Sequence, residues 1–379
     1  MKIVLSYDEL TKVLNFSSII LSDKIVEEKM KNVIFVVTKD SVKIVFYNAL
    51  TFCRTLIENV QTIEGVDEGE WVFQVKFNEL MKVLNGYVGL SKTKVDTLEF
   101  SDDVSKVKVS VSEVALKDED ASLNQVSVFR IDNVPLLDSI EKDIKMEFPE
   151  GADVVSGADV LLYVDSLFPV MANDTGNAIA NKLNFADDYV FVLSSYMTAF
   201  FKNRLSEHLK GVTLGYSSVN FLKKMAEMGD ISLKRTEKYL CVSVGMSEAF
   251  MRFQPIRMRY SQYVGRFSKD NGILLNRLYL KDVLRRMGNM STDGICKIQG
   301  DDLYVENTSF SQVIPIIRSK GEVEGVSFKI SVPTIEKLII GKDSAFPEEI
   351  FLYLKKEGSG YALFFADKTG AWFTQTQVR

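Results

Sequence analysis

The feature that most constrains this chain is a local pattern that occurs about six times: a short amphipathic helix followed by strand-rich segments. The expected helices begin roughly 55 to 81 residues apart, although the copies share little sequence identity. They are expected at 7–16, 77–85, 158–171, 218–228, 278–290 and 333–340. Self-similarity at such spacing is the mark of an internal repeat. The pattern therefore predicts a chain built from copies of one helix-plus-strands unit.

The segment 278–290 illustrates the unit. Apolar residues recur there at helical spacing, which predicts one apolar side; they are Leu280, Val283, Leu284 and Met287. Cationic residues lie on the other side, and they are Lys281, Arg285 and Arg286. Two short strand-like runs follow within 294–305, separated by Gly300-Asp301-Asp302, which predicts a hairpin.

Pairs of acidic residues stand just before several of the expected strands. Examples are Asp102-Asp103, Asp187-Asp188 and Asp301-Asp302. Paired carboxylates suit a metal site or an acid/base couple, but Asp also tolerates the backbone angles of tight turns. Because the pairs recur at equivalent turn positions, we favour the structural interpretation.

Composition narrows the class of protein. The 379 residues carry 46 Lys+Arg against 51 Asp+Glu, so no net positive charge draws the protein to nucleic acid. The three cysteines, Cys53, Cys241 and Cys296, are odd in number and far apart, which suits reduced thiols in a reducing compartment. The start of the chain has no signal-peptide pattern, and no apolar run approaches a membrane span of ~18 residues. We expect an intracellular protein without a membrane partner.

Motifs for catalysis are missing. His208 is the single histidine, so neither a zinc pattern nor a convincing Ser-His-Asp triad is expected. No Gly-x-Gly-x-x-Gly run occurs, and the segment 341–344 lacks the upstream glycine of a phosphate-binding loop. The sequence predicts no catalytic residue, no metal and no cofactor, and favours a binding protein over an enzyme.

Most of the expected helices carry cations on the side away from their apolar stripe. The candidate DNA-contacting residues from this pattern are Lys12, Lys82, Lys223, Lys224, Lys281, Arg285, Arg286 and Lys337, with Lys342 just beyond the last helix. The third helix departs from the pattern, because Asp159 and Asp165 give it no basic side. Such residues often only solvate a helix. In an acidic protein, a bias in five of six helices favours loose contacts with phosphates, which carry no sequence information.

Grouping the units in pairs predicts an α+β protein with three domains of typical size. The expected bounds are 1–125, 126–260 and 261–379.

At this point the whole chain resembles the DNA polymerase sliding clamps, specifically the bacterial type with three domains per chain, as a phage or otherwise divergent member. The most specific stretches are 70–86, 273–289 and 326–339, which look like the strand-then-helix openings of clamp half-domains. The aromatic run 259–267 is similar to the connector entering the third domain, and 371–379 to the closing strand.

The resemblance implies a head-to-tail homodimer that closes into a ring, with helices inside and sheets outside. A ring of three subunits is the alternative. Heterologous interfaces of this kind close on themselves or form filaments, and pairing would hide the edge strands. Such a ring encircles duplex DNA, is placed there by a clamp loader, and tethers DNA polymerase, whose effective concentration at the primer end rises. The resemblance adds Lys24 to the DNA-facing residues and implies the cytoplasm of a bacterial or phage-infected cell.

The family also binds partner peptides in a cleft between its second and third domains. The matching positions here are Tyr196, Met197, Tyr260, Tyr263, Val264, Thr374 and Thr376. Two stretches depart from the bacterial pattern: Ser195-Tyr196-Met197 replaces a Gly-His-Arg-like run, and Thr374-Gln375-Thr376 replaces a Met-Pro-Met-like run. An altered cleft or a different ligand motif follows from these differences. Alternatively, Tyr260 and Tyr263 only fasten the connector to a domain.

The sequence also fits a different class of function. A repeat-built scaffold that binds proteins, and never encloses DNA, would show the same repeats, with helices basic by chance. An enzyme is the third alternative.

Overall fold

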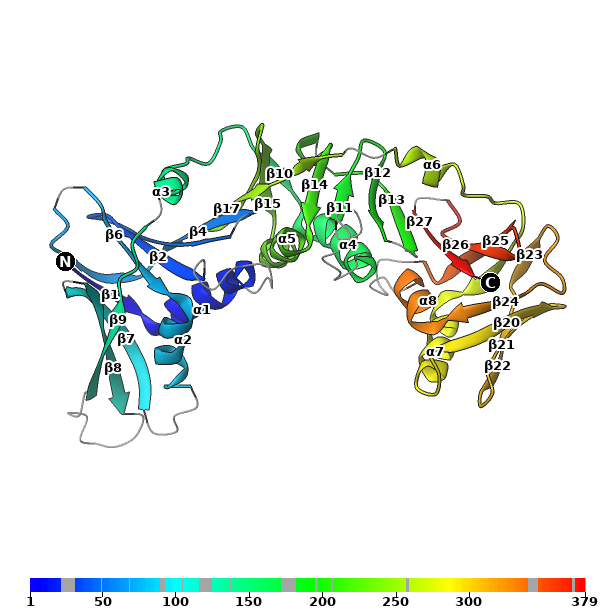
Figure 1. Cartoon of the computed structure of the whole chain (residues 1–379), viewed down its shortest axis with the longest axis horizontal. Helices are drawn as coiled ribbons and strands as arrows, with labels where there is room; N and C mark the ends of the chain where they lie inside the picture. The colour runs from blue at the N-terminus through cyan, green and yellow to red at the C-terminus, as the bar shows by residue number, and fades with distance from the viewer. Residues whose placement is uncertain are drawn as a thin grey trace. The chain divides into compact units, whose positions relative to one another are not determined.

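The computed structural model describes two compact units. It covers residues 1–21, 31–48, 50–67, 69–88, 93–103, 105–115, 125–136, 138–171, 182–194, 197–205, 207–256, 259–339, 347–369 and 372–378. The first unit comprises Met1–Val154 and Asn220–Arg252, and the second Val155–Val219 and Phe253–Arg379. Both are α+β, with antiparallel sheets and short helices (Figure 1).

Six copies of one element order make up most of the chain, as the sequence predicted. Each repeat has an opening strand, a helix, a two-strand hairpin and a third strand. Repeats 1 and 2 are β1 (Lys2–Ser6), α1 (Tyr7–Ser17), β2 (Asn32–Val37), β3 (Val42–Tyr47), β4 (Thr51–Ile57), and β6 (Trp71–Lys76), α2 (Phe77–Asn85), β7 (Thr93–Asp103), β8 (Lys106–Ala115), β9 (Gln125–Asp132). Repeats 3 and 4 are β10 (Asp153–Val155), α4 (Gly157–Leu167), β11 (Lys182–Phe185), β12 (Tyr189–Leu193), β13 (Met197–Lys202), and β14 (Val212–Gly215), α5 (Tyr216–Met228), β15 (Ile231–Arg235), β16 (Tyr239–Val244), β17 (Ser247–Arg252). Repeats 5 and 6 are β19 (Gly272–Asn276), α7 (Arg277–Gly288), β20 (Asp293–Gln299), β21 (Asp302–Glu306), β22 (Ser311–Pro315), and β24 (Ser327–Ser331), α8 (Val332–Ile339), β25 (Glu349–Glu357), β26 (Gly360–Ala366), β27 (Trp372–Val378).

A few short elements lie between the repeats, and the periodicity of the sequence did not predict them. They are β5 (Val60–Glu64), α3 (Asp138–Ile144), β18 (Gln254–Pro255), α6 (Ser261–Val264) and β23 (Arg318–Lys320). Helices of seven and four residues span too few turns to show a 3.6-residue period.

The acidic pairs lie at the turns of the hairpins. Asp187-Asp188 separates β11 from β12, Asp301 lies in the turn after β20 while Asp302 begins β21, and Asp102-Asp103 ends β7 before β8. The expected position of these pairs at hairpin turns is therefore confirmed.

The repeats form pairs by exchanging their opening strands. β1 pairs with β7 of repeat 2, while β6 pairs with β2 of repeat 1. Repeats 5 and 6 do the same, because β19 pairs with β25 and β24 pairs with β20. In repeats 3 and 4, β14 pairs with β11 and β10 neighbours β15. The three pairs fit the expected three domains, whose bounds stay a prediction; the first bound falls at Gln125, where β9 begins.

Two sheets continue from one pair of repeats into the next through their third strands. In the first unit β4 pairs with β17 inside an eight-stranded sheet, ordered β10-β15-β16-β17-β4-β3-β2-β6. In the second unit β13 pairs with β27 inside a ten-stranded sheet, ordered β18-β14-β11-β12-β13-β27-β26-β25-β19-β23. The smaller sheets, β5-β1-β7-β8-β9 and β22-β21-β20-β24, end in the third strands β9 and β22.

Each of the two large sheets has helices of the repeats on one face and a connector on the other (Figure 1). The described residues of the connector between β9 and β10, with α3, pack on the eight-stranded sheet around Ile34, Tyr47 and Phe250. The described residues of the connector between β18 and β19, with α6, pack on the ten-stranded sheet around Phe191, Phe200 and Phe373. Among the described residues, no helix is long and apolar enough to cross a membrane.

Candidate nucleic-acid interface and partner cleft

The helix α7 carries the largest group of candidate DNA contacts. It starts at Arg277, one residue before the expected start, because the side chain of Asn276 accepts a hydrogen bond from the Tyr279 N–H at 2.9 Å and caps it. The predicted apolar stripe is buried: Leu280, Val283, Leu284 and Met287. On the opposite side Arg285 and Arg286 are exposed and Lys281 is half-buried.

The helix α8 lies beside α7 in the same unit (Figure 1). It buries Val332, Ile335, Leu338 and Ile339 and leaves Lys337 exposed. Two helices that turn apolar sides to the sheets thus present cations on a common side. The sequence-predicted contact Lys342 falls outside the described residues.

The first unit contains a similar pair. Helix α1 buries Leu10 and Leu14 and exposes Lys12, while α2 buries Leu80 and exposes Lys82. The candidate Lys24 falls outside the described residues.

The helices of repeats 3 and 4 are less basic. On α5, Lys223 and Lys224 are half-buried, and Lys224 Nζ donates to Glu227 Oε2 at 2.7 Å, which offsets its charge locally. On α4 the exposed Asp159 lies in the first turn, and the last turn has no basic residue.

The residues expected in the partner cleft lie on two faces of the ten-stranded sheet. Met197 pairs with Thr376, so both point to the same face. Thr374, two residues before Thr376, also points there, and its hydroxyl donates to the Leu338 carbonyl oxygen of α8 at 3.3 Å.

The connector residues lie on the other face. Tyr260 packs on Phe191 with ring centroids 5.0 Å apart, and Tyr263 and Val264 join the same apolar cluster. Burial, with Asp188 and Asp187 nearby, raises the pKa of Tyr260 above its ordinary value of 10.0. The structure therefore brings Met197, Thr374 and Thr376 together on one face but sets Tyr260 and Tyr263 apart from them, and Tyr196 falls outside the described residues.

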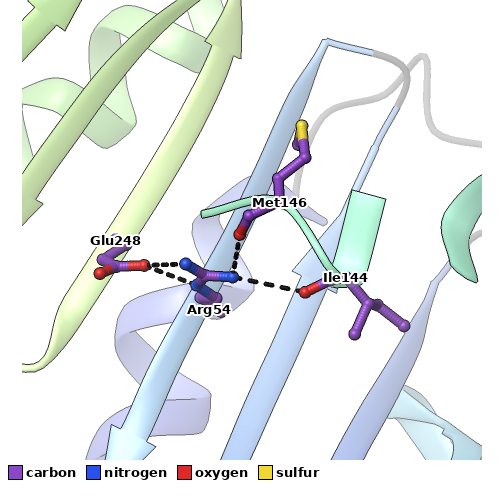
Figure 2. Close-up of polar contacts among 4 residues, drawn as sticks. All are labelled: Arg54, Ile144, Met146 and Glu248. Carbon is purple, nitrogen blue, oxygen red and sulfur yellow. Dashed lines mark hydrogen bonds and ion pairs between the residues drawn. The ribbon is translucent and has the colours of Figure 1, made fainter. Parts of the chain in front are cut away.

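Arg54 fastens the first connector, and no pattern in the sequence predicted this role (Figure 2). Its Nε and Nη2 both lie 2.5 Å from Glu248 Oε2, across the β4–β17 pairing. Its Nη1 donates to the Ile144 carbonyl at 3.3 Å and to the Met146 carbonyl. The partners of Arg54 are 90 or more residues away in sequence, so no local pattern reveals them.

The thiols are free and buried, as expected. Burial raises the pKa of Cys53 and of Cys296 to about 12 and that of Cys241 to about 11. Since the thiolate is the reactive form, these side chains are packing groups. Within the ranges that the structure describes, no three His, Cys, Asp or Glu residues are grouped to hold a metal ion.

Comparisons with known proteins agree with this architecture. No protein-family model and no curated protein sequence matches the chain. Among solved structures, the DNA polymerase III subunit beta of Pseudomonas aeruginosa is 12% identical, with a TM-score of 0.73 and 100% of each chain covered. The DNA polymerase III beta subunit of Thermotoga maritima is 14% identical, with a TM-score of 0.71, over 100% of this chain and 99% of that one. The Helicobacter pylori beta clamp, solved bound to a DNA ligase peptide, is 12% identical, with a TM-score of 0.72 and 100% of each chain covered. The resemblance seen in the sequence is thus confirmed, and the chain has along its full length the fold of the bacterial DNA polymerase III beta subunits, the sliding clamps.

Proposed function

We propose that this chain is a DNA sliding clamp, a non-catalytic processivity factor that encircles duplex DNA and tethers DNA polymerase. The observation that carries the proposal is the sixfold repeat, spread over the whole clamp fold, in which exposed cations lie on the helices of an acidic protein. Each pair of repeats would form one domain. The protein would act in the cytoplasm of a bacterial or phage-infected cell.

Contacts with DNA would be loose and would carry no sequence information. The helices of the repeats have 8 to 13 residues, and none has more than three cations outside the core, which is too few to bind tightly in a groove of DNA. Binding through phosphates weakens as salt rises, because each neutralised phosphate releases counterions. Closure of the ring would then keep the protein on DNA even though its affinity for DNA is low.

Head-to-tail dimerisation would complete the ring through the two third strands that end the smaller sheets. Within the chain, third strands already pair twice, as β4 with β17 and as β13 with β27. Only β9 and β22 lack such a partner among the described strands. Val128 of β9 is 47% exposed and Val313 of β22 is 36% exposed. Exposed apolar edges of this kind promote association, and mutual pairing would cover both.

The internal pairing also predicts the register of that interface. The carbonyls of Thr51 and Phe310 accept hydrogen bonds from equivalent turn residues, Asn48 and Asn307. Thr51 pairs with Met251, which lies one residue before the end of β17. In β9 the residue one before the end is Ile131, so the same geometry pairs Phe310 with Ile131 of the second copy. Val313 then pairs with Val128. This register also places the buried residues of both strands on one face, which a one-residue slip would reverse.

Partner proteins would be DNA polymerase and a clamp loader, bound through a peptide cleft near β13 and β27. The similar clamp bound to a DNA ligase peptide supports this part of the proposal. Met197 and Thr376 would face such a peptide, while Tyr260 and Tyr263 would position the connector.

A topological experiment tests the function. The protein is loaded by its clamp loader onto nicked circular DNA, the free protein is removed by gel filtration, and half of the complex is cut once with a restriction enzyme. We expect the protein to remain on the circles and to leave the linear DNA, because a ring slides off an end. Equal retention on both forms would contradict encirclement and favour a scaffold that binds DNA or protein from outside.

A further inference from the structure

The helices of repeats 1 and 5 begin with a side chain that reaches the far end of the neighbouring helix. Tyr7, the first residue of α1, donates from its hydroxyl to the Leu84 carbonyl oxygen of α2 at 3.1 Å. Arg277, the first residue of α7, donates from Nη1 to the Ile339 carbonyl oxygen of α8 at 3.4 Å. Leu84 and Ile339 are both the eighth residue of their helices. Two different side chains therefore make the same contact at equivalent positions.

The chemistry of the acceptors explains why they attract donors. The last four carbonyl groups of an α-helix have no partner within the helix, and they lie at the negative end of its dipole. In α2 the Tyr7 hydroxyl is a second donor to the Leu84 carbonyl oxygen, which also accepts from the Tyr87 N–H at 3.1 Å. In α8 the Arg277 guanidinium donates to the Ile339 carbonyl oxygen. Arg277 is 0% exposed, which is costly for a cation unless its donors are used. Its Nε donates to the Pro347 carbonyl oxygen at 3.1 Å, and its backbone N–H donates to the Glu348 carbonyl oxygen at 2.6 Å.

The contact at Arg277 defines how α7 and α8 lie along each other. At the opposite end of the pair, a Cβ added to Gly288 would come within 3.3 Å of Val332 Cγ1. The last residue of α7 thus meets the first residue of α8, while the first residue of α7 meets the last residue of α8. The helices are antiparallel, with both ends in contact. Axial sliding would break the hydrogen bond at one end and cause a clash at the other.

The exposed cations depend on this alignment. Arg285 and Arg286 lie on α7 and Lys337 on α8, while in the first unit Lys12 lies on α1 and Lys82 on α2. Repeat 3 differs, because its helix opens with Gly157, which has no side chain to form the bond, and has no basic residue in its last turn. The side-chain contact thus accompanies the two pairs in which both helices expose cations.

We propose that Tyr7 and Arg277 are positioning residues, which set the alignment of two helices in a pair and thereby the spacing of their cations along the phosphates of DNA. This inference rests on the proposed function. Neither residue touches DNA in this account; each acts through the cations of its own helix pair.

The test uses the full-length protein with Tyr7→Phe and Arg277→Met, alone and combined. Tyr163→Phe is the matched control, because Tyr163 on α4 also donates its hydroxyl to a carbonyl, that of Lys202 at 2.8 Å, but this acceptor is in a strand. Binding to a short linear duplex is measured by fluorescence anisotropy between about 50 and 200 mM salt. Melting temperatures and the mass of each variant are measured in parallel.

We expect Tyr7→Phe to weaken binding roughly threefold and Arg277→Met roughly tenfold, because a hydrogen bond from a charged group is the stronger one. The slope of log affinity against log salt should become shallower by about 0.9 for each phosphate that the variant no longer neutralises. Tyr163→Phe should change neither quantity.

Unchanged affinity and salt slope in variants that melt earlier would overturn the proposal, because Tyr7 and Arg277 would then only stabilise the fold. If Arg277→Met fails to fold, Tyr7→Phe decides alone, since it removes a single oxygen atom. A wild-type protein that is not retained on circular DNA would contradict the proposed function itself. Retention of the wild type, with unchanged variants, would contradict the positioning role alone.

Discussion

The two connectors cover equivalent faces of the two large sheets by different chemistry. In the first unit, Arg54 of β4 binds Glu248 of β17 and two carbonyls of the connector, Ile144 and Met146 (Figure 2). In the second unit, the connector inserts aromatic rings: Phe267 stacks on Phe373 of β27 with centroids 4.6 Å apart and an interplanar angle of 2°. A charged fork thus adds to the apolar packing of the first junction, whereas stacked rings form the centre of the second.

The difference shows what the repeat preserves. Both junctions join third strands of neighbouring pairs of repeats in antiparallel register, so the backbone topology is the same. Apolar side chains of both connectors pack on their sheets, but the first junction adds the Arg54–Glu248 ion pair and the second adds the stacked rings of Phe267 and Phe373. Pairing of strands needs only backbone groups and a buried face, which many sequences satisfy. This freedom accounts for repeats that share their element order while sharing little sequence.

The largest effect is expected at the aromatic junction. Phe267→Ala removes a ring that contacts Phe373, Phe364 and Tyr353. Loss of such a ring costs about 3 kcal/mol. Hydrogen exchange should therefore show protection of the β27 amides lower by roughly a hundredfold, with little change in β4. Phe267→Leu is the control and should lose less than half as much.

A smaller effect is expected at the charged junction. Arg54→Met keeps an apolar stem but removes the donors to Glu248 and to both carbonyls. Because Glu248 is 31% exposed and partly hydrated, we expect a loss of about 2 kcal/mol, below the range for fully buried pairs. The measurement is hydrogen exchange of the β17 amides at two salt concentrations.

The salt dependence of the two losses distinguishes the two junctions. The loss on Arg54→Met should shrink as salt screens the partly exposed ion pair, whereas the loss on Phe267→Ala should not. Equal salt dependence of the two losses would show that the junctions do not differ in kind.

Local periodicity predicted the helix of every repeat, and the differences lie at the helix ends. The segment 77–85 is helical over the expected residues, whereas the helix expected at 158–171 gives way at Leu167 to a 3₁₀ turn that contains Pro169. The strand exchange between β1 and β7 was not predicted, because it joins residues far apart in sequence. No pattern within a single helix specifies such a pairing.

Only the exposed residues of the candidate site could be predicted from the sequence. Exposed cations such as Lys82 and Arg285 follow from helical spacing, because the apolar stripe determines which side faces solvent. Arg277 shows the limit: next to three cations of the same helix it looks like one more solvated residue, yet it is fully buried. Its role depends on carbonyls contributed by α8 and the segment after it, which only the folded chain brings near.

The central claim is that two copies close into a ring around DNA through β9 and β22. The most direct test introduces Val128→Cys and Val313→Cys into one chain, since the native thiols are buried and stay protonated. The clamps are loaded onto nicked circles, cross-linked by mild oxidation and then treated with detergent. The account predicts a covalent dimer of about twice 42.8 kDa that stays on circular DNA in detergent and is released once the circle is cut. A cross-linked protein that detergent strips from intact circles, or no cross-link at all in the loaded complex, would contradict it.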